Sequence, residues 1–205
     1  MKDVVRPYDQ SSRRVQAGLT REMVLQAARD LLAREADAAR FTLDAVALRA
    51  GVSRATVFNL FGGKPGLLNA LFDEMSGRAG LMDVDALLTQ ADPHRALADY
   101  VERFGDFYGE GRAVLRKLRA YAALDADFAR VVQARDDKRI AGLLYLVRRL
   151  QPNGARPTTR QRLLAAKLKA LLGLEVFESI AGPGRSPREA SAVVLEMAQA
   201  ILGRR

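Results

Sequence analysis

The chain has 205 residues, of which 49% are hydrophobic, and it carries a formal net charge of +9. This length and composition allow a sizeable buried core, and the basic charge favours a polyanionic partner such as nucleic acid. Cysteine is absent and His94 is the only histidine, which excludes disulfides and leaves little for metal binding or acid–base catalysis. No apolar run is long enough to span a bilayer. We therefore expect a cytoplasmic protein that is not an enzyme, with no catalytic residue, metal site, cofactor or membrane partner.

Apolar residues recur at intervals of three and four, and no alternating strand pattern appears, which predicts an all-α fold of about nine helices. Basic residues outnumber acidic ones in residues 1–18, which are expected to form a flexible basic arm or an ordinary disordered tail. The first helix is expected to begin at an N-cap, Thr20, and to bury Val24, Ala28 and Leu32 on one face.

Two short helices follow, joined by a glycine-containing turn. Thr42 is a predicted N-cap for the first of them, which ends at Gly51, and the second begins after Ser53 and stops at two glycines. In a helix-turn-helix, the second helix of such a pair enters the major groove of DNA. With a fourth helix behind them, residues 19–79 are predicted to form a three-helix helix-turn-helix domain.

Residues 80–205 are expected to form a separate helical bundle. The residues of its last two helices are apolar around much of the circumference, so these helices are expected to be covered on two sides. The predicted helices of the bundle span residues 97–108, 114–121, 125–150, 159–181 and 187–202.

The helix-turn-helix segment, from Phe41 to Phe61, contains a specific set of residues. They are Thr42 at the start of the second helix, Ala50-Gly51-Val52-Ser53 at the turn, Thr56 and Phe61 in the third helix, and Lys64 before Leu67-Leu68. This set, within a match from about Thr20 to Met75, resembles the N-terminal domain of the TetR family. The resemblance implies a regulator that binds double-stranded operator DNA, with a ligand-binding and dimerisation domain over residues 80–205. It also implies a homodimer formed through the last two helices of the chain.

The chain departs from the family pattern at two positions of the third helix. Phe58 stands where the family usually has a tyrosine that reaches a phosphate, and Leu60 stands where it often has a histidine. Loss of the tyrosine hydroxyl removes one hydrogen bond to the DNA backbone, and the base contacts are expected to differ.

The chemistry of the side chains assigns each DNA contact. Arg54 is expected to pair with guanine, Thr56 to meet a thymine methyl group or a phosphate, and Asn59 to read adenine or hold the backbone. Thr42, Ser53 and Lys64 are expected to hold phosphates, because helix N-termini attract anions. Alternatively, the two hydroxyls only cap their helices and the lysine is solvated. The complete predicted set is Thr42, Ser53, Arg54, Ala55, Thr56, Phe58, Asn59 and Lys64.

A ligand pocket is expected in the second domain, where aromatic residues recur on neighbouring helices, although such stripes often form plain core. Asp136 interrupts an apolar stripe and must be paired with an arginine such as Arg139 or Arg162, hydrated or facing a ligand. The predicted pocket residues are Phe104, Phe107, Tyr108, Tyr121, Asp136, Tyr145 and Phe177.

The last two predicted helices supply more apolar surface than one core face needs, which predicts the dimer interface. Its expected residues are Leu171, Leu172, Leu174, Val176, Phe177, Ile180, Val193, Val194, Met197 and Ile201. The expected function is that of a repressor released from operator DNA by a small apolar or aromatic effector. Two alternatives stay open: a DNA-binding regulator without an effector, and a small helical enzyme or binding bundle with an incidental helix-turn-helix, which shows no salt-dependent DNA binding.

Overall fold

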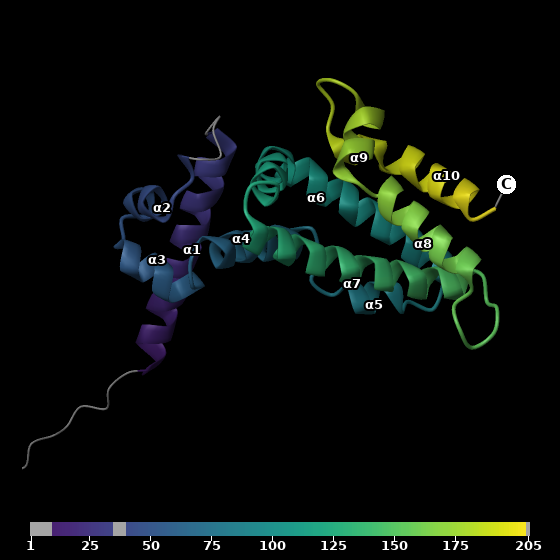
Figure 1. Cartoon of the computed structure of the whole chain (residues 1–205), viewed down its shortest axis with the longest axis horizontal. Helices are drawn as coiled ribbons and strands as arrows, with labels where there is room; N and C mark the ends of the chain where they lie inside the picture. The colour runs from purple at the N-terminus through teal and green to yellow at the C-terminus, as the bar shows by residue number, and fades with distance from the viewer. Residues whose placement is uncertain (1–9, 35–39, 204–205) are drawn as a thin grey trace, which may run out of the picture. The chain divides into compact units, whose positions relative to one another are not determined.

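The computed structural model describes residues 10–34 and 40–203 (Figure 1). These residues form α-helices and one 3-10 helix, with no strand among them, as the sequence predicts. The chain divides into two compact units, residues 1–71 and 72–205, and the dividing point lies within one helix. The helices are α1 (Gln10–Arg34), α2 (Leu43–Ala50), α3 (Arg54–Phe61), α4 (Lys64–Arg78), α5 (Val84–Leu88), α6 (Pro93–Ala122), α7 (Ala126–Leu150), α8 (Thr159–Leu171), α9 (Leu174–Ala181), η2 (Pro187–Ala190) and α10 (Ser191–Ile201).

Helix α1 begins at Gln10, ten residues before the expected cap at Thr20. The Thr20 hydroxyl donates to the Gln16 carbonyl at 2.9 Å, so this residue lies inside the helix and does not cap it. Gly18 does not interrupt the helix, since a glycine in a helix interior costs only about 1 kcal/mol. The expected flexible arm is therefore helical from residue 10 to residue 18, and its residues 1–9 lie outside the described residues.

Helices α2 and α3 begin and end where the sequence predicts. The Thr42 hydroxyl accepts from the Ala45 amide at 3.1 Å, and Gly51 ends α2 in the left-handed conformation with a φ of 68°. The Ser53 hydroxyl caps α3 by accepting from the Thr56 amide at 3.0 Å. Helices α1 and α3 both pack on α2, so the three helices form the core of the first unit, in which Val24, Val46 and Val57 are fully buried.

Helix α4 starts very close to the end of α3. A Cβ atom on Gly66 would lie 1.8 Å from the Phe61 carbonyl oxygen, so only glycine fits at this position. Gly62 and Gly63, with φ of 70° and 120°, form the turn between the two helices. The helix is continuous across the dividing point of the two units.

The second unit contains one helix, α6, where the sequence predicts two. This helix runs without a break through Gly105, Gly109 and Gly111. A Cβ atom would lie 2.1 Å from the Ser191 Oγ at Gly105 and 2.1 Å from the Met75 Cε at Gly111. These glycines therefore allow close packing of neighbouring elements and do not end the helix.

Helices α8 and α9 replace the single helix predicted over residues 159–181. The chain leaves the helical path at Leu172 and Gly173 because the Leu172 carbonyl accepts from the Tyr108 hydroxyl at 2.8 Å and from Arg139 of α7. The last predicted helix is likewise divided into η2 and α10. Short α5 was not predicted, because five residues are too few to show a helical period.

The second unit buries most of the apolar surface that was expected at a dimer interface. Helix α7 packs on α6 and α8, and α10 packs on α6 and α8. Five of the residues predicted for the interface are buried in this core, so the prediction was wrong for Leu171, Leu172, Leu174, Phe177 and Val194. Because α9 and α10 are apolar around much of their circumference, the sequence alone did not show which face of each helix the unit itself covers.

An ion pair ties α9 to α6 on the surface of the same unit. Glu178 Oε1 accepts from Arg112 Nε at 2.7 Å and lies 2.9 Å from Arg116 Nε. Burial alone would raise the pKa of Glu178, but the hydrogen bonds from Arg116 and Arg112 outweigh it and hold the pKa below its ordinary value. Among the helices of the described residues, none is long and apolar enough to cross a membrane.

Candidate nucleic-acid interface and ligand cavity

One face of α3 is exposed and carries most of the predicted DNA-contacting residues. Val57 anchors the opposite face of this short helix in the core of the first unit. Because the left-handed Gly51 ends α2 and the Ser53 cap starts α3, both ends of the turn are fixed, and α3 presents its outer face in one defined orientation. The residues on this face are Ser53, Arg54, Ala55, Phe58 and Asn59, which are exposed, and Thr56, which is half-buried.

The hydroxyl groups of the two N-caps are already engaged within the protein. Thr42 and Ser53 accept from backbone amides, and the Ser53 Oγ lies 2.9 Å from the Thr56 Oγ1. Capping of one amide leaves others at the same N-terminus pointing outward, and these favour a phosphate. Capping and phosphate binding at these two positions are therefore compatible.

Arg54 is held only loosely. Its Nε lies 3.5 Å from a carboxylate oxygen of Asp44, and both side chains are largely exposed. An exposed ion pair at this distance is worth little, so Arg54 can exchange Asp44 for another acceptor at small cost. The Lys64 ammonium lies 5.4 Å from the centre of the Phe41 ring, which positions its charge at the start of α4.

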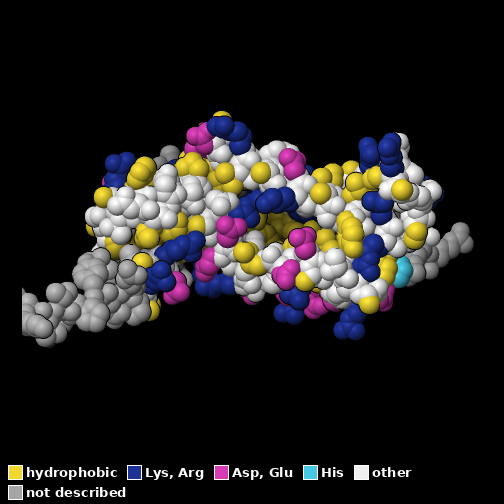
Figure 2. All heavy atoms as spheres, turned by 90° about the horizontal axis from the view of Figure 1, so that it is seen from below, with side chains coloured by type: hydrophobic (Ala, Val, Ile, Leu, Met, Phe, Trp, Pro, Cys, Tyr) yellow, Lys and Arg dark blue, Asp and Glu magenta, His cyan; other side chains and the backbone are white. Residues whose placement is uncertain are grey.

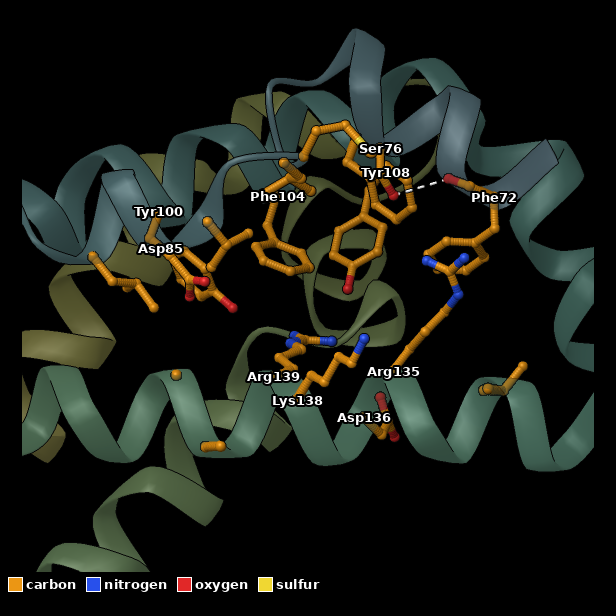
Figure 3. A pocket seen from close by; sticks show the side chains of 18 of the residues that line it. Phe72, Ser76, Asp85, Tyr100, Phe104, Tyr108, Arg135, Asp136, Lys138 and Arg139 are labelled. Atoms are coloured by element: carbon orange, nitrogen blue, oxygen red, sulfur yellow. Dashed lines mark hydrogen bonds between the residues drawn. The ribbon is translucent and has the colours of Figure 1, made fainter. Parts of the chain in front are cut away.

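A cavity of about 860 Å³ lies in the second unit, lined by residues of α4 from Phe72 onward, by α5, α6 and α7, and by the segments beside α5. Figure 2 shows a hollow on one face with hydrophobic side chains inside it and charged side chains at its border. In Figure 3, Phe104 and Tyr108 face Lys138 and Arg139 across the cavity. A cavity of this size is within the range of small-molecule sites, about 300–1,000 Å³.

Five of the seven residues predicted for the pocket line this cavity. They are Phe104, Phe107, Tyr108, Asp136 and Tyr145. Phe177 does not line it, because this ring is fully buried behind Tyr108, with ring centres 5.3 Å apart. Tyr121 does not line it either, because its ring packs on Phe128, 5.7 Å away, and its hydroxyl donates to Asp125 at 2.6 Å.

The polar residues of the cavity were mostly missed. Asp136 lies 2.6 Å from Lys169 of α8, and not beside Arg139 or Arg162 as expected. Arg135 and Arg139, four residues apart on α7, both line the cavity. Their guanidinium groups lie 4.5 Å and 4.3 Å from the ring centres of Phe72 and Phe104. The signal in the sequence was this spacing of four residues, which places the two arginines on one face of α7.

The cavity also contains a buried phenol. Burial raises the pKa of Tyr100 to about 12, although neighbouring Arg139 lowers it in part. The hydroxyl therefore stays protonated at neutral pH. Among the described residues, no group of three His, Cys, Asp or Glu side chains is placed to hold a metal ion.

The comparisons agree on the fold. Residues 24–71 match the family model described as bacterial regulatory proteins, tetR family. A comparison with curated proteins gives no match. A TetR-family regulator from Syntrophomonas wolfei superposes with a TM-score of 0.71 at 12% identity, covering 91% of this chain and 96% of that chain.

Two further solved structures are similar to this chain. NalD, the secondary repressor of the MexAB-OprM multidrug efflux pump in Pseudomonas aeruginosa, has a TM-score of 0.67 and 21% identity, covering 90% of this chain and 96% of NalD. SmeT in complex with triclosan has a TM-score of 0.67 and 21% identity, covering 89% of this chain and 90% of SmeT. At these identities the likeness shows a shared fold, whereas the family model matches the sequence of the helix-turn-helix itself. Residues 24–71 therefore match the N-terminal domain of the TetR family of bacterial regulatory proteins, and the chain as a whole shares the fold of solved TetR-family regulators.

Proposed function

We propose that this protein is a dimeric repressor that binds operator DNA through α3 and leaves it when a small molecule occupies the cavity of the second unit. The observation that carries the proposal is the exposed face of α3, held by the Thr42 and Ser53 caps within a TetR-family domain. One short helix offers few base contacts, so a symmetric dimer with two such helices is needed for specific binding.

Exposed apolar residues on α8 and α10 support the dimer. Leu163 is 55% exposed, Val193 is 44% exposed and Met197 is 42% exposed, although α8 and α10 pack on each other. Neighbouring large apolar side chains left in water on two adjacent helices favour a second copy of the same surface. This outer face includes Val193 and Met197, which the sequence predicted for the interface, and Leu163, which it did not.

The cavity and α4 support release by an effector. Phe72 and Ser76 line the cavity, and the same helix begins at Lys64, beside α3. A ligand that favours one arrangement of α4 changes operator affinity in proportion to its preference, about 5- to 150-fold for typical coupling energies. The triclosan complex of SmeT and the repressor role of NalD are precedents for this mode of action on the same fold.

Selection of bound sequences from a random DNA pool tests the DNA-binding proposal. The account predicts a pseudo-palindrome with half-sites about 34–36 Å apart, or a multiple of this. Arg54→Ala is expected to relax preference at one position of each half-site, at a cost of about 1–3 kcal/mol. Arg156→Ala, an equal loss of charge in the exposed 152–157 loop, is the matched control and should leave the selected sequence unchanged. Failure to enrich any sequence would refute the proposal.

A further inference from the structure

Arg139 is the most unusual polar group of the cavity. One of its terminal nitrogens donates to the Leu172 carbonyl, the side chain is also hydrogen-bonded to Tyr100, and the guanidinium lies 4.3 Å from the centre of the Phe104 ring. Its Nε is buried and has no hydrogen-bond partner among the described residues. A buried donor without an acceptor is costly, and a guanidinium offers its free donors as a planar fork suited to a carboxylate.

The other charges of the cavity do not satisfy Arg139. Arg135 pairs with Asp73, Arg119 pairs with Glu175, and Asp136 pairs with Lys169. In the part of the chain that the structure describes, neither Arg139 nor Lys138 has a carboxylate within ion-pairing distance. The remaining lining carboxylate, Asp85, is exposed and belongs to α5. The cavity therefore has an excess of positive charge beside apolar walls.

We propose that the cavity binds an aromatic carboxylic acid, whose ring contacts Phe104 and Phe107 and whose carboxylate accepts from Arg139. The inference rests on the proposed effector site and assigns its ligand class. Figure 3 places Arg139 and Lys138 opposite Phe104 and Tyr108 of α6, and the Arg139 guanidinium lies 4.3 Å from the Phe104 ring centre, so a ligand ring beside Phe104 has its carboxylate close to Arg139. A carboxylate fits better than a neutral group because it fills the donor fork and balances the positive charge.

Arg139 is not required to satisfy the backbone that it contacts. The Leu172 carbonyl also accepts from the Tyr108 hydroxyl at 2.8 Å, so it keeps a partner when Arg139 is replaced. Arg139→Met retains the length of the side chain and removes its charge and donors. Arg148→Met, on the same helix but outside the cavity lining, is the matched control.

The test is calorimetric titration of the full chain without DNA at neutral pH. The probes are naphthoic, biphenylcarboxylic and anthracenecarboxylic acids, each beside its primary amide, which has the same shape and no charge. We expect at least one acid to bind about 10- to 100-fold more tightly than its amide. Arg139→Met should remove this preference, and Arg148→Met should keep it.

Three outcomes would overturn the inference: equal affinity of every acid and its amide, no binding of any acid, or an equal loss of acid and amide binding in Arg139→Met. A thermal melt of each variant shows whether it is folded. If Arg139→Met is unfolded, Lys138→Met takes its place, and we expect it to lose part of the preference for the acid over the amide. An unchanged preference in Lys138→Met would then overturn the inference. DNA binding by the same preparation is measured separately, so failure of the ligand class is distinguished from failure of the proposed regulator function.

Discussion

Leu163 and Leu168 lie on the same helix, α8, and their replacement by alanine separates the proposed dimer face from the core. Leu168 is fully buried within the second unit, whereas Leu163 is 55% exposed. Leu168→Ala is expected to lower the free energy of unfolding by about 2–5 kcal/mol, because the side chain leaves a cavity in a packed core. Leu163→Ala should leave the folded protomer nearly unchanged.

The effect of Leu163→Ala should appear in dimerisation. Complete burial of a leucine side chain contributes about 1.5–3 kcal/mol, and about half of this remains to be gained at an exposed position. Two-fold symmetry counts the residue twice, so the dimer should weaken by about 1.5–3 kcal/mol, or roughly 10- to 150-fold in its dissociation constant.

Sedimentation equilibrium across a range of protein concentrations measures the dissociation constant, and circular dichroism at a concentration where the chain is monomeric measures the fold. Leu163→Ala should shift the first measurement and spare the second. A dimer as tight as that of the unmodified chain would refute the assignment of this face, and a loss of helical signal would show that Leu163 belongs to the core after all.

Three further predictions concern local features. Gly66→Ala should lower the melting temperature through a loss of about 1–3 kcal/mol, because the added Cβ meets the Phe61 carbonyl at 1.8 Å, whereas Gly18→Ala has open space and should stabilise α1 by about 0.5–1 kcal/mol. Thr42→Ala should lower the free energy of unfolding, measured by urea denaturation, by about 1 kcal/mol, whereas Thr42→Ser keeps the capping hydroxyl and should retain most of that stability. Equal losses in the two variants would exclude a capping role. The folded-state pKa of Glu178 lies below its ordinary 4.5, so its ion pair stabilises the fold above pH 4.5 and is lost as the pH falls through the folded-state pKa. Glu178→Gln should therefore lower the melting temperature at pH 7 and reduce the difference in melting temperature between pH 7 and pH 4. An unchanged difference would contradict this.

The helix-turn-helix was predicted closely because its determinants are local. Thr42 and Ser53 are caps that act within three residues, and Gly51 ends its helix through its own φ. Such signals do not depend on the rest of the fold. The start of α1 was predicted wrongly because Thr20 has a side chain suited to a cap, but the chain before it is already helical and its hydroxyl donates to the Gln16 carbonyl within the helix.

The second unit was harder to predict because its signals are tertiary. Gly109 and Gly111 lie between the two helices that the sequence predicted here, and the closeness of Ser186 and Met75 explains why glycine is present at these positions inside α6. The apolar residues of α9 and α10 gave no indication of which face the unit covers and which it leaves exposed. Arg139 was considered only as a partner of Asp136, since its position opposite Phe104 depends on how α6 and α7 pack.

The salt dependence of binding to the selected DNA site is the most direct test of the central claim that α3 and its neighbours bind DNA. Each phosphate neutralised should contribute a slope of about −0.9 to the plot of log binding constant against log salt concentration. Fluorescence anisotropy over a series of salt concentrations measures this slope. The account predicts that the log binding constant falls steeply and linearly with log salt concentration. In a Lys64→Met variant the slope should be smaller by the contribution of about one phosphate contact per half-site. A binding constant independent of salt, or no binding at low salt, would contradict it.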